Sequence, residues 1–162
     1  MNKGSSVPTA IAALVVIAIC FVGFMYIKDN VNMKRESAKE AEAKEIGELP
    51  RIKVSIAGKV YYAKLESNKT AKSFLENLPL SIDMKDDNNY SKKGYAYVKF
   101  VSTARKLKKV KAGDIVLSGE SVVVVFFKDC NTNDKYSIIG HIDNIDYIEE
   151  KELRIGFSEV GK

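Results

Sequence analysis

The sequence of 162 residues contains no tryptophan and no glutamine, and it has one histidine, two cysteines and three prolines. The cysteines are Cys20, inside a long apolar run, and Cys130, far along the chain. That separation excludes an internal disulfide, so oxidation does not stabilise the fold. The acidic stretch from 83 to 89 lacks the glycine and the later glutamate of a calcium-binding loop. A solvated loop is therefore expected there, and no metal site.

A long uncharged segment is the clearest feature near the amino end. Residues 7–27 carry no charge, and a helix of that length would span about 30 Å, enough for one bilayer crossing. A cleaved signal would need a small-x-small cleavage site, but Phe24, Met25 and Tyr26 stand in its place. Cys20 is not expected to be a lipoprotein cysteine, because the residue before it is the bulky Ile19, where lipoprotein signals have Gly, Ala or Ser. We therefore predict an uncleaved transmembrane helix at 7–27, after a tail at 1–6, with the lipid bilayer as its partner.

Two sequence features disagree about which side of the membrane the rest of the chain occupies. Basic residues near the segment are more frequent on its carboxyl side, which places that side in the cytoplasm. A very short amino tail is instead typical of signal anchors that export the domain on their carboxyl side. We expect a single-pass protein of the cell membrane with an extracytoplasmic domain, although the charge bias indicates the opposite.

Residues 28–50 are rich in Ala, Glu and Lys and end with Gly47 and Pro50. This composition favours a solvated helix without an apolar stripe, and a disordered tether is an equal alternative. In either case the segment is a spacer, and its length is roughly 30 Å if it is helical. The remaining residues, 51–162, hold 20 basic and 15 acidic side chains, so this predicted domain carries a net charge of +5. That excess favours anionic surfaces without identifying one.

Short β-forming runs dominate residues 51–162, and the central one is Val122 to Phe127, six apolar residues typical of a strand buried on both faces. A first hairpin is expected at 52–65 and a helix face at Ala71, Phe74, Leu75 and Leu78. Ser67 or Asn68 can cap this helix. Further strands are expected at 80–84, 94–101, 114–117, 136–142 and 153–157, with a loop at 86–93 and a short helical turn at 144–150. About eight strands and one good helix predict a closed or nearly closed β-barrel.

Four motifs of this region occur in the order and spacing of a known family: T-A-K-S-F-L-E-N-L-P-L-S-I-D-M, K-A-G-D-I, V-V-V-F-F-K-D and Y-S-I-I-G-H-I-D. The domain at 51–162 resembles the small bacterial and archaeal cyclophilin-like domain. The resemblance implies a mainly β, closed barrel with one or two capping helices. It also implies a ligand groove where Asp114, Phe127, Tyr136 and His141 approach one another. Members commonly have no assigned activity, and exported or lipid-anchored relatives occur.

Prolyl-isomerase cyclophilins carry a catalytic arginine in a Phe-His-Arg segment, together with glutamine and aromatic residues. No Phe-His-Arg occurs here, and Arg51, Arg105 and Arg154 of the domain lie in other contexts. Catalysis requires positioned groups and not the fold alone, so we expect no isomerase activity. His141 is expected to be structural, because no serine or cysteine in a recognisable nucleophile context accompanies it. Cys130 is expected to be an incidental loop thiol, and we predict no catalytic residues and no cofactor.

A basic segment is the most distinctive local feature of the surface: Arg105, Lys106, Lys108, Lys109 and Lys111. Lys92, Lys93 and Lys99 and the aromatic residues Tyr95, Tyr97 and Phe100 precede it. Phosphate contacts and base stacking would suit nucleic acid, but a domain tethered to a membrane favours lipid headgroups or envelope polymers. Alternatively, the aromatic residues face the core and the lysines face water.

The sequence therefore predicts a membrane-anchored cyclophilin-like domain that binds a peptide, protein or small ligand and is not an enzyme. Two alternatives stay open. One is a prolyl isomerase with a non-standard active site, and the other is a purely structural interaction module of the cell envelope.

Overall fold

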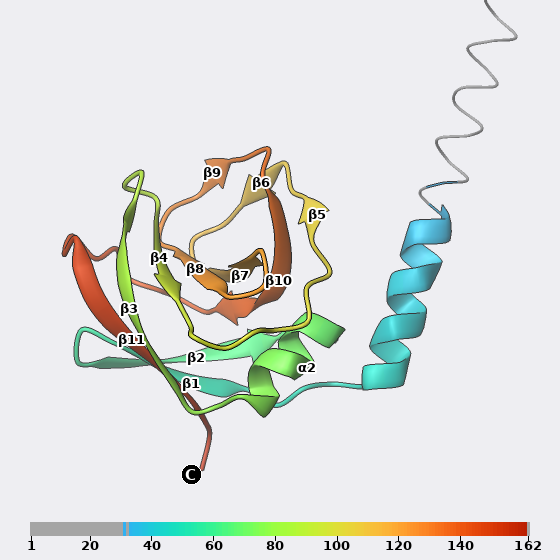
Figure 1. Ribbon diagram of the computed structural model, residues 1–162, viewed down its shortest axis with the longest axis horizontal. Helices are drawn as coiled ribbons and strands as arrows, with labels where there is room; N and C mark the ends of the chain where they lie inside the picture. Colours follow the sequence, from blue (N-terminus) through green and yellow to red (C-terminus); the bar gives the residue numbers. More distant parts are fainter. Residues whose placement is uncertain (1–30, 32, 162) are drawn as a thin grey trace, which may run out of the picture. The chain divides into compact units, whose positions relative to one another are not determined.

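The computed structural model describes residue 31 and residues 33–161 of the chain. Figure 1 shows a β-barrel with one short helix packed against it. In chain order the elements are β1 (Ile52–Ile56), β2 (Lys59–Leu65), α2 (Lys69–Glu76), β3 (Leu80–Asp87), β4 (Ser91–Tyr95), β5 (Arg105–Lys106), β6 (Lys109–Val110), β7 (Asp114–Ser118), β8 (Val122–Phe126), β9 (Cys130–Asn131), β10 (Lys135–Ile142) and β11 (Glu152–Glu159).

Eight of these strands close into an antiparallel barrel. Their order is β2-β1-β11-β3-β4-β8-β7-β10, and an additional pairing between β10 and β2 joins the two ends. Strand β10 is long enough to pair with β7 along most of its length and with β2 over its last three residues. Gly140 takes part in both pairings, opposite Ile115 of β7 and Leu65 of β2. The closed, mainly β barrel expected from the sequence is confirmed.

The barrel interior is filled by alternate residues of the strands. Strand β1 shows the pattern plainly, because Ile52, Val54 and Ile56 are buried while the residues between them are exposed. This two-residue period is what a strand with one face in a core requires. Phe74 of α2 extends the core at one end of the barrel, where its ring packs edge-to-face on Phe157 with the centroids 5.3 Å apart.

Strand β8 is buried on both faces, as its run of apolar residues predicts. Val123 and Val125 belong to the interior core, whereas Val124 and Phe126 belong to a second, separate cluster. The second cluster also contains Val110 of β6, and β6 pairs with β9 in a separate two-stranded sheet. Because the members alternate with interior residues along β8, this second cluster lies on the outer surface of the barrel.

Helix α2 begins and ends as its sequence requires. The side chain of Asn68 accepts a hydrogen bond from the backbone amide of Ala71 at 2.9 Å, which is the expected N-cap. Ala71 and Phe74 are buried on its inner face. The helix ends at Glu76, shortly before Pro79, and the prediction of this helix is confirmed.

A second helix occupies residues 33–46, within the segment for which the sequence favours a helix. The described residues fall into two units, one that ends at Ala41 and one that begins at Glu42, and the whole barrel lies in the second. None of the helices among the described residues is both long enough and apolar enough to cross a membrane. The predicted transmembrane helix at 7–27 lies outside the described residues.

Three local predictions are wrong. The expected loop at 86–93 is mostly strand, because β3 continues to Asp87 and β4 begins at Ser91. The expected strand at 94–101 ends at Tyr95, where the chain leaves the sheet. Residues 144–150 form no helical turn. After a turn with Asn144 at a φ of 53°, this segment has no regular secondary structure and places Ile148 in the core.

The junction between β10 and β2 predicts a sharp difference between two glycines. A Cβ atom added at Gly140 would lie 2.4 Å from the backbone oxygen of Lys64, whereas one added at Gly156 would meet nothing closer than 3.7 Å. We expect Gly140→Ala to lower the free energy of unfolding by about 2 kcal/mol, because backbone atoms cannot move aside without opening the barrel. The matched variant Gly156→Ala is expected to change it by less than about 0.5 kcal/mol. Urea unfolding of both variants is the measurement, and equal stabilities would contradict the proposed role of Gly140.

Candidate functional site

Asp114 and His141, two of the four residues expected in a ligand groove, are brought together by the structure. They face each other across the pairing of β7 and β10, and Nδ1 of His141 lies 2.8 Å from Oδ1 of Asp114. The backbone amide of Lys111 donates a hydrogen bond to the other carboxylate oxygen at 2.8 Å. Gly113 permits this contact, since a Cβ atom there would lie 2.9 Å from the imidazole ring. The pair is partly exposed, and Nε2 of His141 is the ring nitrogen that could contact a ligand.

The other two expected groove residues are buried in different parts of the domain. Phe127 belongs to the interior core and Tyr136 to the outer cluster. Burial, helped by the nearby Asp134 carboxylate, raises the pKa of Tyr136 to about 12. Cys130 also packs against the outer cluster, and burial followed by the charge of Asp129 raises the pKa of its thiol. A thiol in that setting is a poor nucleophile.

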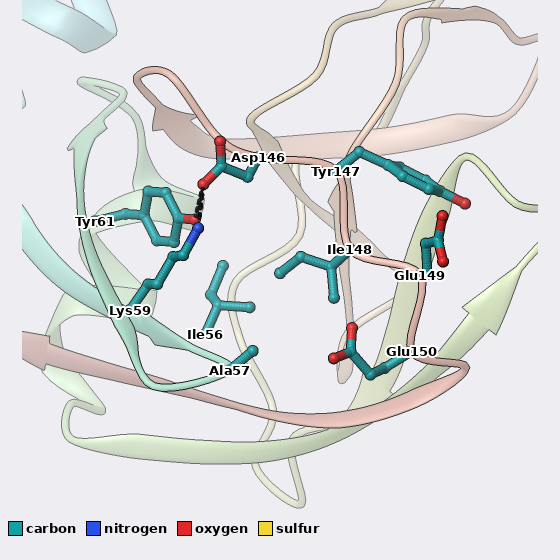
Figure 2. A pocket seen from close by; sticks show the side chains of 9 residues that line it. All are labelled: Ile56, Ala57, Lys59, Tyr61, Asp146, Tyr147, Ile148, Glu149 and Glu150. Atoms are coloured by element: carbon teal, nitrogen blue, oxygen red, sulfur yellow. Dashed lines mark hydrogen bonds and ion pairs between the residues drawn. The ribbon is translucent and has the colours of Figure 1, made fainter.

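A different site is formed at the end of the barrel where β1 turns into β2 (Figure 2). The hairpin and the segment after β10 enclose an open cavity of about 650 Å³. The volume falls in the range of small-molecule and peptide side-chain sites. Its lining residues are Ile56, Ala57, Lys59, Tyr61, Asp146, Tyr147, Ile148, Glu149 and Glu150. We call this cavity the barrel-end pocket.

One wall of the barrel-end pocket is fixed by a polar network on Asp146. The ammonium of Lys59 and the hydroxyl of Tyr61 donate hydrogen bonds to the same carboxylate oxygen of Asp146, at 2.8 and 3.0 Å. These bonds lower the pKa of Asp146, and the bond with Asp146 raises the pKa of Lys59. Burial and the hydrogen bond to Asp146 raise the pKa of Tyr61. The wall is therefore anionic at Asp146 and cationic at Lys59 near neutral pH, and its groups are held in place.

The rest of the lining combines apolar surface with negative charge. Ile56 and Ile148, both nearly inaccessible to solvent, lie in the centre of the view in Figure 2 and belong to the barrel core. Glu149 and Glu150 add two carboxylates, so the lining carries three acidic groups and one basic group. Tyr147 already holds a cation on its ring, because Nζ of Lys128 lies 3.9 Å from the ring centroid. Such a lining can hold a ligand that has an apolar part and a positive charge.

The sequence gives a partial signal for this pocket. Ile145 and Ile148 alternate with acidic residues in a segment that has no strand partner, which indicates a chain packed on the core with its charges outward. The partner hairpin lies more than eighty residues away in sequence, since Lys59 bonds to Asp146 across 87 positions. Only the closed barrel brings them together.

The basic segment is exposed at all five of its predicted positions, Arg105, Lys106, Lys108, Lys109 and Lys111. Binding of nucleic acid by this segment together with Tyr95 would need the two to be neighbours. They are not neighbours in the sheet, because β5 and β4 are separated by β10, β7 and β8. Phe100 is buried, whereas Tyr95 and Tyr97 are exposed. Lys92 does not reach the surface either. Its side chain is 2% exposed and ends 3.3 Å from the carboxylate of Asp86.

The acidic residues of 83–87 are occupied by cations of the protein itself. Arg154 donates two hydrogen bonds to Asp83, at 2.6 and 2.9 Å, and this lowers the pKa of that carboxyl. Asp87 pairs with Lys93 at 3.0 Å. Among residue 31 and residues 33–161, no three His, Cys, Asp or Glu side chains come together in a group that could hold a metal ion.

The fold and the sequence motifs agree with a comparison against known protein families. A family model described as the Cyclophilin-like family matches residues 54–158, which span all eight barrel strands in whole or in large part. No match was found among curated proteins or among solved structures. On the strength of the family match and the closed barrel, this chain belongs to the Cyclophilin-like family.

Proposed function

We propose that this chain is a single-pass, membrane-anchored binding protein without isomerase activity. Its barrel holds a peptide, protein or small ligand in the barrel-end pocket, and the part of the ligand inside the pocket has an apolar body and a positively charged group. The protein needs no cofactor for this role.

The charge of the pocket is the observation that carries the proposal. Residues 51–162 have a net charge of +5, yet the pocket lining holds Asp146, Glu149 and Glu150 against Lys59, with Lys128 on the ring of Tyr147 as the other cation described there. A negative cavity on a positive domain gives a local preference for cations that the rest of the surface opposes. Ala57 and Tyr147, which are exposed residues of the lining, add apolar surface for a hydrocarbon stem. An arginine or lysine side chain of a peptide, or an organic amine, combines both features.

The argument against isomerase activity rests on missing groups. An isomerase must stabilise the twisted amide with a positioned donor, for which the cyclophilin enzymes use arginine. The arginines of the barrel domain are engaged or remote: Arg51 pairs with Asp143, Arg154 pairs with Asp83, and Arg105 lies in the exposed strand β5. The two alternatives, a non-standard isomerase and a structural envelope module, make different predictions in the experiments below.

The pocket proposal predicts binding that depends on the ligand's charge. Blocked acetyl-Leu-Lys-amide and its uncharged counterpart acetyl-Leu-norleucine-amide differ only in the ammonium group. In NMR titrations of a ¹⁵N-labelled unit 42–162, the lysine peptide is expected to shift amides of Ala57 and of residues 146–150. Glu150→Gln is expected to weaken this binding up to about fivefold, the effect of one exposed charge pair.

The control for that titration is Glu66→Gln, which removes the same charge from an exposed position outside the pocket. It is expected to leave the lysine-peptide affinity unchanged. Equal shifts from the norleucine peptide, or equal weakening by both variants, would contradict a cation-selective pocket. No shift with either peptide, combined with a stable complex in cells detected by crosslinking, would favour the structural module.

Isomerase activity is a separate question with a direct assay. We expect the full chain to leave the cis–trans relaxation of a proline-containing test peptide at its uncatalysed rate, which is tens to hundreds of seconds. An acceleration that is proportional to protein concentration and lost in Asp114→Asn or Arg105→Ala would establish the non-standard isomerase instead.

The domain is proposed to face the outside of the cell. Cys130 is a poor reporter because it is partly buried and its thiol pKa is raised. A chain with both Cys130→Ser and Lys53→Cys places a thiol on an exposed position of β1 instead. A membrane-impermeant maleimide is expected to label this chain in intact cells, and the chain with Cys130→Ser alone is the control. Labelling only after lysis would place the barrel in the cytoplasm.

A further inference from the structure

Two exposed tyrosines stand at the end of β4 and in the segment just after it. Tyr97 is 88% exposed and Tyr95 is 52% exposed, and their rings pack edge-to-face with the centroids 5.1 Å apart. Val101, in the same segment, is also largely exposed. Two large aromatic side chains that pack on each other on a folded surface indicate a contact site. We call Tyr95 and Tyr97 the tyrosine surface.

The backbone of the exposed Tyr97 is strained. Its φ is +58°, in the left-handed region that bulky residues rarely adopt and that costs on the order of 1 kcal/mol or more. A glycine or asparagine would suit this conformation better, yet the position holds one of the most exposed large side chains described in the chain. Strain of this kind is retained where the surrounding structure enforces it, and it is common at functional surfaces.

The surrounding structure does enforce it, because the residues on both sides of Tyr97 are fixed. The amide of Ala96 donates to the backbone oxygen of Ser121 at 2.9 Å, and the amide of Phe100 donates to that of Glu120 at 2.8 Å. Phe100 is buried against Phe74, with the ring centroids 5.4 Å apart. The tyrosine rings therefore project from a rigid base.

The charges around the tyrosine surface are largely neutralised. Lys93 pairs with Asp87 at 3.0 Å, and Lys99 pairs with Glu120 at 3.4 Å. A surface of phenol rings with paired charges at its rim matches the boundary between lipid headgroups and acyl chains, where tyrosine is enriched. The chain itself provides the reason for such a partner, since residues 7–27 form an uncharged apolar segment of membrane-spanning length.

We infer that the tyrosine surface docks the barrel onto the bilayer that anchors the chain. This inference rests on the proposed membrane anchoring. The connection through residues 28–50 keeps the barrel near the membrane, so even a weak contact is formed at high effective concentration. The contact is aromatic and not electrostatic, so it is expected to survive high salt, unlike attraction by the basic segment.

The absence of tryptophan from the chain makes a direct test possible. The full chain with Tyr97→Trp is placed in phosphatidylcholine nanodiscs, and its fluorescence is measured with and without lipids spin-labelled near the headgroup. Quenching to about half or less is expected, because an interfacial ring lies within contact of the label. The matched control is Tyr62→Trp, at a position 48% exposed on β2. Three strands separate β2 from β4 in either direction around the barrel, so this control faces away and is expected to stay unquenched.

The fluorescence measurements separate docking through the tyrosine surface from contact through basic residues and from loss of the anchor. Quenching in the Tyr97→Trp chain and not in the Tyr62→Trp chain, unchanged in 0.5 M salt, supports docking through the tyrosine surface. Equal quenching in both chains overturns the inference and leaves the anchor intact. A Tyr97→Trp chain that co-purifies with the nanodiscs and is not quenched also overturns the inference and leaves the anchor intact. Quenching in the Tyr97→Trp chain that disappears in salt assigns the contact to basic residues and also overturns the inference. A chain that does not associate with nanodiscs overturns both the anchor and the inference.

Discussion

The pairing of β10 with β2 is the interaction on which the rest of this structure depends. Without it the sheet is an open ribbon with two free edges, and its interior residues have no second wall to pack against. The pairing covers only three residues of β10, from Gly140 to Ile142, and it requires the backbones to approach more closely than a side chain at Gly140 permits. A large core is therefore completed by a short seam.

The candidate site is a direct product of that seam. The chain leaves β10 at Ile142, turns at Asn144 and crosses the end of the barrel, where Ile145 and Ile148 pack on the core. Asp146 of this segment faces the β1–β2 hairpin, where it bonds to Lys59 and Tyr61. The position of the charges in the pocket is thus set by the same packing that closes the barrel. In a family defined by its fold, function depends on such local groups.

Sequence periodicity was sufficient for the features that depend on one strand at a time. The alternation of β1, the doubly buried β8 and the capped helix α2 all follow from local patterns. It failed at 94–101, where alternate aromatic residues resemble a strand. There Phe100 turns inward and Tyr97 outward because hydrogen bonds to residues 120 and 121 redirect the chain. The burial of Lys92 was not predictable, because it depends on the partner of one charge, Asp86. The barrel-end pocket was not predictable, because it depends on contacts between distant segments.

Closure of the barrel also limits how any partner can be recognised. Each of the eight barrel strands is hydrogen-bonded to neighbours on both sides over at least part of its length, so no barrel strand is unpaired along one whole edge. A peptide that added a strand to this sheet, which is how many β-domains bind extended ligands, would find only short unpaired stretches, such as the residues of β2 before Ala63. The barrel-end pocket instead offers side chains of a hairpin and a loop, so its selectivity is open to change by single substitutions that leave the sheet unaltered.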